Sequence, residues 1–343
     1  MVAPIPGRSQ PANNSEGSNW KAEQAAAIRD PEELFRLLSL DLADLPAART
    51  AATQFPLRLP RALLDCIEPG NPADPVLRQF LPLGKELDTV AGYSRDPLAE
   101  TAAQAGPQAT PGLLQKYSGR ALLTLTGACG VHCRYCFRRH FDYTDANPLA
   151  DWPAIRQAIA ADKGIEEVIL SGGDPLLLGT DKLRRVSTEL AALPHLRRLR
   201  IHSRQPVVLP SRVDDELLDW LTGLPLDTVL VLHVNHPAEL GTRAREALRR
   251  LRQTGITLLN QSVLLGGVND SADTLCELSE ALFANGVLPY YLHVLDKVEG
   301  AAHFDLPESR ARLLWNQVHA RLSGYLVPRL VREIPEASGK ILL

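Results

Sequence analysis

The sequence has little of what marks membrane, exported or nucleic-acid-binding proteins. No stretch approaches the ~20 apolar residues that cross a bilayer, and the N-terminus lacks a basic end followed by an apolar run. The formal net charge is only -3, from 37 basic and 40 acidic residues, so no overall field attracts nucleic acid or anionic membrane. We therefore expect a soluble, cytoplasmic protein with neither nucleic acid nor membrane as a partner.

Cysteine is also scarce, with five residues in a chain of 343. Cys66 and Cys276 are isolated, whereas Cys129, Cys133 and Cys136 fall close together. The odd number and the uneven spacing exclude a disulfide framework. Clustered thiols in a reducing compartment usually bind a metal.

Composition and periodicity divide the chain into four segments. Residues 1–18 are rich in Pro, Gly, Ser and Asn and are expected to form a disordered tail. Residues 19–110 show apolar positions at helical spacing between Pro-rich joints, which predicts an N-terminal helical region. Residues 111–328 carry the repeated pattern described next, and residues 329–343 form a C-terminal segment.

Residues 111–328 alternate short apolar runs with amphipathic segments, the pattern of repeated βα units. Six strands are predicted, at 121–126, 167–171, 198–203, 228–235, 256–264 and 288–295. Five helices are predicted between them, at 151–162, 181–193, 214–221, 242–255 and 271–286. Because such crossovers are nearly always right-handed, the fold class is α/β, a partial (βα)6 barrel resembling a TIM barrel.

Polar residues follow every predicted strand. They are Cys129 onward, Ser171 to Asp174, His202 to Arg204, His233 to His236, Asn260 with Gln261, and His293 to Asp296. Because the active site of such a barrel lies at the C-terminal strand ends, we expect these residues to share one rim.

The loop ACGVHCRYCFRRHF has the spacing Cys-x3-Cys-x2-Cys. Three thiolates are one ligand too few for the four irons of a cubane cluster, so one iron stays open. A structural zinc site of Cys3His type, with His132 as fourth ligand, is the alternative. Structural zinc usually draws its ligands from two separated pairs, and the loop's basic cluster is too short for a nucleic-acid-binding module. The spacing therefore favours the cluster.

This loop resembles the radical S-adenosylmethionine (radical SAM) superfamily, in which the motif follows the first barrel strand. Tyr135 takes the place of the aromatic residue before the last cysteine. In the superfamily, a glycine-rich segment after the second strand approaches the methionine part of the cofactor. Ser171, Gly172, Gly173 and Asp174 match that segment, although taken alone they are a generic turn.

From Tyr117 to Lys340 the chain resembles the lysine 2,3-aminomutase family. The resemblance is carried by YSGRALL, CRYCFRRHF, VILSGGDPL, RIHSRQPVVLPSRV, HVNHPAEL, LLNQSVLLGGVND, PYYLHVLDKVEGAAHF and GYLVP. It is strongest to the EpmB branch, which makes β-lysine for modifying elongation factor P, and residues 30–110 resemble that branch as well. Catabolic free-lysine aminomutases are the alternative within the family. They extend well past the cofactor lysine, whereas this chain stops three residues after it.

The resemblance implies three cofactors. It implies a [4Fe-4S] cluster on Cys129, Cys133 and Cys136, with S-adenosylmethionine on its open iron. It also implies pyridoxal 5'-phosphate, bound as a Schiff base by Lys340. Without the resemblance, Lys340 would be an ordinary exposed terminal lysine.

Further roles are carried over residue by residue. Tyr117 and Arg120 match family positions that stack on the pyridine ring and bind its phosphate, although both could pack at the barrel edge. His233 and Gln261 fall where the family contacts the nucleoside, although a histidine at a strand end is more often hydrogen-bonded structure. Ser171, Gly172, Gly173 and Asp174 match the segment beside the methionine part of the same cofactor.

The substrate implied by the resemblance is L-lysine, converted from α-lysine to β-lysine. Arg138 matches the arginine that pairs with the substrate carboxylate. Asp296 and Glu333 match carboxylates that bind the distal ammonium, with Glu333 standing where catabolic enzymes have Asp; it could instead pair with a nearby arginine. The implied partners are an electron donor such as a flavodoxin or ferredoxin, and the elongation factor P lysine ligase.

Overall fold

The computed structural model describes residues 20–101, 110–143, 149, 151–335 and 337–343. The tail expected at residues 1–18 lies outside the described residues. The N-terminal region begins with three helices, α1 (Trp20–Ala25), α2 (Pro31–Leu37) and α3 (Leu45–Gln54). Helix α2 starts as its sequence predicts, because the Asp30 side chain accepts a hydrogen bond from the Glu32 N–H (3.0 Å) and Pro31 follows the cap.

The expectation of a helical region up to residue 110 is correct only in its first part. From Phe55 to Leu98 the helical elements are 3-10 turns, namely η2 (Arg61–Cys66), η3 (Leu77–Gln79) and η4 (Gly84–Leu87). Prolines recur through this stretch, and each removes a backbone N–H and clashes with a preceding helical turn. They are Pro56, Pro60, Pro69, Pro72, Pro75, Pro82 and Pro97.

One sheet of nine strands forms the body of the molecule, and its strands are ordered as in the sequence. The six predicted strands are confirmed as β2 (Arg120–Thr126), β3 (Glu167–Gly172), β4 (Arg198–His202), β5 (Asp227–Leu232), β6 (Thr257–Val263) and β7 (Leu288–His293). All six run parallel. The antiparallel hairpin strand β1 (Leu113–Tyr117) precedes them.

The C-terminal segment continues this sheet. Helix α11 (Glu308–His319) leads to β8 (Arg329–Arg332), which pairs in parallel with β7. The two-residue strand β9 (Ile341–Leu342) then pairs antiparallel with β8. The sequence pattern missed both strands because two to four residues are too few to show a period. Since Lys340 directly precedes β9, the sheet itself holds the C-terminal lysine in place.

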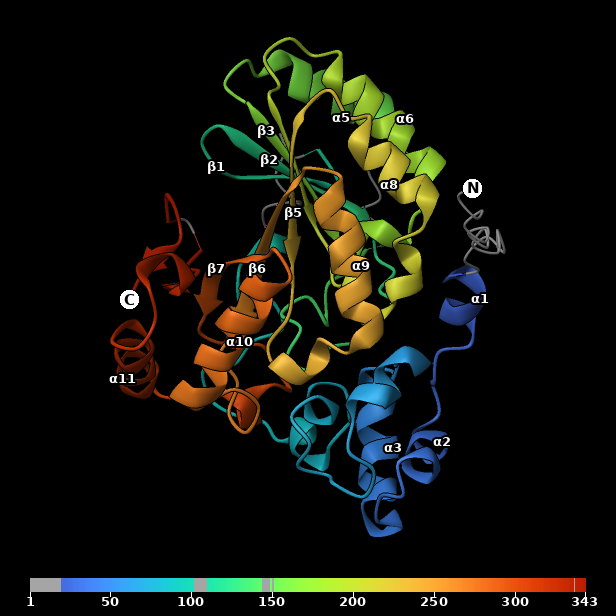
Figure 1. Ribbon diagram of the computed structural model, residues 1–343, viewed down its shortest axis with the longest axis vertical. Helices are drawn as coiled ribbons and strands as arrows, with labels where there is room; N and C mark the ends of the chain where they lie inside the picture. Colours follow the sequence, from blue (N-terminus) through green and yellow to red (C-terminus); the bar gives the residue numbers. More distant parts are fainter. Residues whose placement is uncertain (1–19, 102–109, 144–148, 150, 336) are drawn as a thin grey trace, which may run out of the picture.

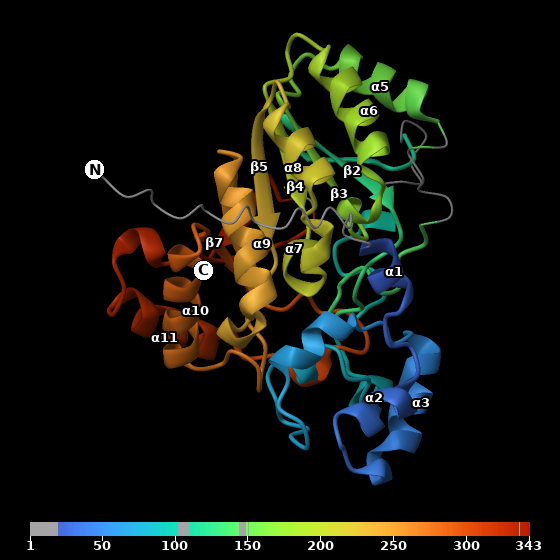
Figure 2. The ribbon, with the colours of Figure 1, turned by 45° about the vertical axis from the view of Figure 1, so that its right-hand side comes forward.

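The five predicted helices are confirmed as α5 (Trp152–Ala161), α6 (Thr180–Ala191), α8 (Asp215–Thr222), α9 (Thr242–Gln253) and α10 (Ala272–Ala284). A single turn, α7 (Gln205–Val208), was not predicted. The helices α5, α6 and α8 to α10 cover the outer face of the curved sheet (Figures 1 and 2). Helices α2 and α3 lie at the lower end of the molecule, and α1 lies at its side, where Glu23 pairs with Arg243 of α9 (2.8 Å). None of the described helices has both the length and the apolar character of a membrane span.

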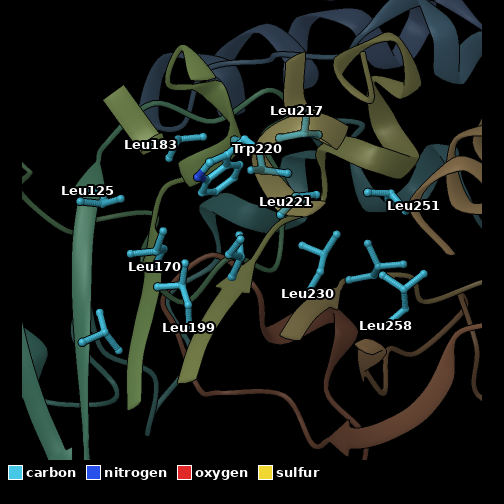
Figure 3. Close-up of a cluster of buried hydrophobic side chains, with 14 of the residues drawn as sticks. Leu125, Leu170, Leu183, Leu199, Leu217, Trp220, Leu221, Leu230, Leu251 and Leu258 are labelled. Atoms are coloured by element: carbon cyan, nitrogen blue, oxygen red, sulfur yellow. The ribbon is translucent and has the colours of Figure 1, made fainter. Parts of the chain in front are cut away.

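Leucines pack the strands against these helices (Figure 3). Leu170, Leu199 and Leu230 on the strands are fully buried, and Leu183 and Trp220 cover them from the helices. Burial of each such side chain contributes roughly 1.5–3 kcal/mol. These apolar side chains occupy the face of the sheet that packs against the helices. Polar residues lie on the opposite face and at the C-terminal ends of the strands.

Candidate active site

A cavity of about 300 Å³ lies at the C-terminal ends of the parallel strands. Every site residue predicted from the sequence lines it. They are Tyr117, Arg120, Cys129, Cys133, Cys136, Arg138, Ser171, Gly172, Gly173, Asp174, His233, Gln261, Asp296, Glu333 and Lys340. The barrel thus gathers side chains from β1 through to the residue before β9 into one chamber.

The cysteine loop follows β2 and forms one wall of this cavity. Cys129, Cys133 and Cys136 all line it, and a turn between the Cys136 N–H and the Cys133 carbonyl (3.0 Å) shapes the loop. His132 is directed elsewhere: its Nδ1 lies 2.8 Å from the Pro56 carbonyl oxygen and its ring stacks on Phe55. The fourth ligand of the alternative zinc site is therefore engaged by the N-terminal region.

Burial affects the free thiols. Burial and the neighbouring Cys133 raise the pKa of Cys136 to about 11, and burial with Cys136 raises the pKa of Cys129 well above its ordinary value. Both thiols are therefore protonated at neutral pH when no metal is bound. Metal binding at this loop must release those protons.

The N-terminal region fastens the cysteine loop from outside the barrel. Arg58 donates to the Cys129 carbonyl (2.9 Å), and the Arg134 N–H donates to the Gln79 carbonyl (2.8 Å). The Arg134 guanidinium pairs with Glu86 through Nε (2.8 Å) and Nη2 (2.5 Å), and both side chains are buried. Sequence motifs did not indicate that the N-terminal region fastens the cysteine loop, because these contacts join segments far apart in the sequence.

The glycine-rich segment fits against the start of the cysteine loop. Gly172 has φ +113°, and a Cβ on it would lie 2.6 Å from the Thr126 carbonyl oxygen. A Cβ on Gly173 would lie 2.3 Å from the Ala128 oxygen, so only glycine allows this approach. The Gly173 N–H donates to the Thr126 oxygen (2.6 Å). The segment therefore sets the position of the loop that it adjoins.

Asp174 is fully engaged with the protein. Its carboxylate accepts from Ser203 Oγ (2.8 Å), the Arg204 N–H (2.8 Å) and the Leu176 N–H (3.0 Å). Burial raises the pKa of Asp174 to about 6 despite these bonds. The side chain joins the ends of β3 and β4 and has little capacity left for a ligand.

Lys340 stands at the opposite end of the cavity. Its ammonium pairs with Glu333 and lies 5.7 Å above the Tyr291 ring. Glu333 also accepts from Tyr117 Oη (3.3 Å) and Lys116 Nζ (3.4 Å). Although burial opposes ionisation, Lys340 and Lys116 lower the pKa of Glu333 to about 2. Glu333 does not form the alternative pair with a neighbouring arginine; it faces the cavity.

Asp296, the second predicted carboxylate, is ionised less readily. Burial and the negative charge of Glu333 raise its pKa to about 7. The two acids lie on one wall, and Asp296 changes charge within the physiological range. Close by, Arg120 lies 4.9 Å above the Tyr117 ring, so the two residues predicted to act together are in contact.

Comparison with known proteins agrees with this geometry. The model of the radical SAM superfamily matches residues 123–278. The chain is 47% identical over 324 residues to an L-lysine 2,3-aminomutase of Escherichia coli (strain K12), covering 94% of this chain and 93% of the other. The chain belongs to the radical SAM lysine 2,3-aminomutase family. It is therefore an isomerase.

Two further relatives carry the same name. The chain is 45% identical over 329 residues to the L-lysine 2,3-aminomutase of Haemophilus influenzae, covering 95% of this chain and 96% of that one. It is 32% identical over 330 residues to that of Clostridium subterminale, covering 96% of this chain and 78% of the relative. A radical SAM enzyme uses a [4Fe-4S] cluster and S-adenosylmethionine, which the three thiols and the glycine segment of this chamber suit.

This aminomutase-family site also contains residues that the sequence placed on the rim without assigning them a role. Arg204 of the HSRQP string lies beside Cys133 and Tyr135, and it is held by Gln79 (2.7 Å) and Glu239 (2.6 Å). Its position after a strand was the only sequence signal that indicated it.

His202 and His293 also line the cavity, and the buried Nε2 of each has no hydrogen-bond partner among the described residues. Burial lowers the pKa of both, to about 3 for His293, so both are neutral. His233 is hydrogen-bonded to Tyr135 Oη (2.8 Å), and Gln261 lines the cavity from β6.

Proposed function

We propose that this chain is an S-adenosylmethionine- and pyridoxal phosphate-dependent L-lysine 2,3-aminomutase that converts α-lysine to β-lysine. The observation that carries the proposal is the arrangement of one chamber, with three thiols on one wall and a lysine beside two carboxylates on the other. The first wall suits an iron-sulfur cluster, and the second suits an aldehyde cofactor and a dibasic amino acid.

Cys129, Cys133 and Cys136 would hold the cluster. Its support is the loop geometry: the thiols line the cavity while His132 is engaged by Pro56. When bound, the cluster and S-adenosylmethionine supply a carbon radical that removes hydrogen from the substrate. Gly172, Gly173, His233 and Gln261 border the space next to the thiols, where the rest of that cofactor would lie.

Lys340 would hold pyridoxal phosphate through Nζ, and Tyr117 and Arg120 would receive its ring and phosphate. The support is that all three line the same end of the cavity and that Arg120 lies above the Tyr117 ring. An arginine fork suits a phosphate, and an aromatic face suits a pyridine ring. The protein would hold these groups at fixed positions relative to the substrate.

Glu333 and Asp296 would bind the distal ammonium of lysine, and Arg138 its carboxylate. A desolvated ammonium needs counter-charge, and the two acids provide it on the Lys340 side. Arg138 donates through Nη1 to Ser171 Oγ (3.2 Å) and the Gly172 carbonyl (3.2 Å) and lies between the two walls. Substrate held at both ends would span from the aldehyde cofactor to the radical source.

In the cell, we propose that the β-lysine modifies elongation factor P, with a flavodoxin or ferredoxin as electron donor and a cytoplasmic location. The support is the sequence resemblance to the EpmB branch, which includes residues 30–110. Deletion of the gene should remove the β-lysyl group from elongation factor P by mass spectrometry. If the modification persists and growth on lysine is lost, the catabolic alternative is correct.

Turnover tests the activity itself. The anaerobically reconstituted chain receives dithionite, S-adenosylmethionine, pyridoxal phosphate and L-lysine, and mass spectrometry follows β-lysine. We expect β-lysine only when both organic cofactors are present. Deoxyadenosine without β-lysine would retain the radical assignment and reject lysine as substrate. A colourless protein with one tightly bound zinc and neither product would reject the enzyme assignment.

A further inference from the structure

An alternating row of charges runs along the floor of the cavity. It consists of Arg138, Glu100, Lys116, Glu333 and Lys340, each paired with the next. Three of these five groups, Arg138, Glu333 and Lys340, face the substrate or the aldehyde cofactor in the function proposed above. Glu100 has no assigned role, and neither does Lys116, which it contacts.

Glu100 is a buried carboxylate, with 3% of its surface exposed. Oε2 accepts from Arg138 Nε (2.6 Å), and Oε1 accepts from Arg138 Nη2 (3.0 Å) and Lys116 Nζ (3.0 Å). Although burial opposes ionisation, Arg138 and Lys116 hold the pKa of Glu100 below its ordinary value. Glu100 is therefore a permanent negative charge that two cations share.

The backbone fixes Glu100 in this position. Ala99 has φ +53°, an unfavourable conformation for a residue with a side chain. The Asp96 carboxylate accepts from the Glu100 N–H (2.9 Å) and the Thr101 N–H (2.9 Å). A strained residue followed by a side-chain cap directs this one carboxylate into the cavity.

Lys116 lies between two carboxylates and is nearer to Glu100. Its Nζ is 3.0 Å from Glu100 Oε1 and 3.4 Å from Glu333 Oε1. Glu333 is the acid that must remain negative to attract a substrate ammonium, and an ammonium already in the protein competes for it. Once Lys340 is bound to the aldehyde cofactor, its ammonium no longer pairs with Glu333. Among the described residues, Lys116 is then the one cation that still forms an ion pair with Glu333.

We propose that Glu100 determines specificity for a dibasic amino acid by taking the shorter contact with Lys116 (3.0 Å), so that Lys116 neutralises Glu333 (3.4 Å) only in part. With Glu100 neutral, Lys116 moves fully onto Glu333. The distal subsite then loses its negative charge and no longer distinguishes an ammonium from a methyl group. This inference rests on the function proposed above.

The test compares two ligands on the full-length, cofactor-loaded enzyme. L-lysine and L-norleucine share the α-amino and carboxyl groups, and norleucine lacks the distal ammonium. Their dissociation constants are measured anaerobically from the absorbance change of the bound pyridoxal phosphate, with no turnover. Because any effect on Arg138 changes both ligands alike, the ratio of the two constants reports only the distal subsite.

We expect Glu100→Gln to reduce the preference for lysine over norleucine about tenfold, which corresponds to the loss of one charge-assisted contact. Glu100→Gln combined with Lys116→Met should restore most of that preference, because the competing ammonium is gone. The Michaelis constant for lysine should rise in Glu100→Gln and should return most of the way to the native value in the double variant. Thermal unfolding of each variant, recorded with bound cofactor, confirms that the chains are folded.

Three outcomes overturn the proposal. The first is an unchanged ratio of the lysine and norleucine dissociation constants in Glu100→Gln. The second is an equal loss of affinity for both ligands. The third is a folded double variant that does not recover the preference for lysine. Each would show that Glu100 acts through Arg138 or through stability alone. A native enzyme that binds norleucine as well as lysine would instead reject the proposed substrate, and so the two failures are distinguishable.

Discussion

Arg204 and Cys133 are in direct contact, with Nη1 of the guanidinium 2.8 Å from Sγ. The same Nη1 donates to Tyr135 Oη (2.6 Å), and Nη2 donates to Gln79 (2.7 Å) and Glu239 (2.6 Å). The guanidinium is almost completely buried, so little water screens its charge. In the proposed site Cys133 would be a cluster ligand, and a positive charge beside it would favour the more negative, reduced form of the cluster.

Removing that charge should make the cluster harder to reduce. Arg204→Met with Glu239→Gln removes the ion pair without leaving a lone buried charge. We expect the midpoint potential to fall by roughly 60 mV, a tenfold change in a one-electron equilibrium. Redox titration followed by electron paramagnetic resonance measures it. Arg204→Lys with native Glu239 is the control, because it keeps the positive charge. Its midpoint potential should stay close to that of the native enzyme. A fall equal to that of the double variant would contradict the charge argument.

The barrel was predictable because its strands and helices are long enough to show their periods. The run from Leu122 to Leu125 and the amphipathic helix 181–193 are examples, and both lie where expected. The polar strand ends indicated the rim of the site, whereas Tyr117, Arg120 and Lys340 came only from the family resemblance. Three features were not predicted: β8 with β9, the 3-10 turns of residues 55–98, and the ion pairs of Glu100 and Arg204.

Those features have different physical causes. The strands β8 and β9 are too short to show a period, and the 3-10 turns follow from recurrent prolines. The ion pairs join side chains of ordinary residue types that lie far apart in the sequence. Glu86 is one acid among 40 acidic residues, and its buried pair with Arg134 depends on how the N-terminal region lies against the cysteine loop. Motifs report local chemistry, whereas such contacts require the fold.

Cysteine variants test the metal assignment. Cys129→Ala, Cys133→Ala and Cys136→Ala should each lose the iron-sulfur absorbance and at least a thousandfold of turnover, since a missing ligand prevents assembly. Iron analysis and the visible spectrum of the reconstituted protein measure this. Cys66→Ala and Cys276→Ala are matched controls outside the cavity, and they should keep full iron. Full iron in any of the first three variants would be incompatible with the assignment.

Lys340→Ala tests the aldehyde site. We expect it to retain the cluster and to lose the cofactor that borohydride fixes covalently, because no amine remains in the same position. Mass spectrometry of the reduced, digested protein locates the adduct. Lys116→Ala is the control within the same cavity and should still yield the Lys340 adduct. An adduct on Lys116 in the native chain would assign the cofactor to the other lysine.

The pairing of Arg134 with Glu86 should make a large contribution to stability. Arg134→Met leaves the buried Glu86 with Arg139 alone (2.8 Å), and loss of one partner of a buried pair costs about 3–5 kcal/mol. Urea denaturation of the cluster-free protein measures the free energy of unfolding. Arg249→Met removes an exposed pair with Glu246 and should leave that free energy unchanged. Equal effects would mean that the buried pair contributes little.

The ionisation of Asp296 should make lysine binding depend on pH. Burial and Glu333 raise its pKa to about 7, while Lys340 and Lys116 oppose that rise and Glu100 adds to it. Below that pH the carboxyl is neutral and attracts an ammonium weakly; above it the carboxylate is charged. The preference for L-lysine over L-norleucine should therefore increase between pH 6 and pH 8, by up to about tenfold, as the ionised fraction does.

The same titration distinguishes Asp296 from other groups. Norleucine carries the same α-amino and carboxyl groups as lysine, so their ionisation cancels in the ratio. Glu333 has a pKa of about 2 and stays ionised across the range, and His293, with a pKa of about 3, stays neutral. Asp296→Asn should give a low ratio that does not vary with pH. A ratio that still rises in this variant would assign the dependence to a different group.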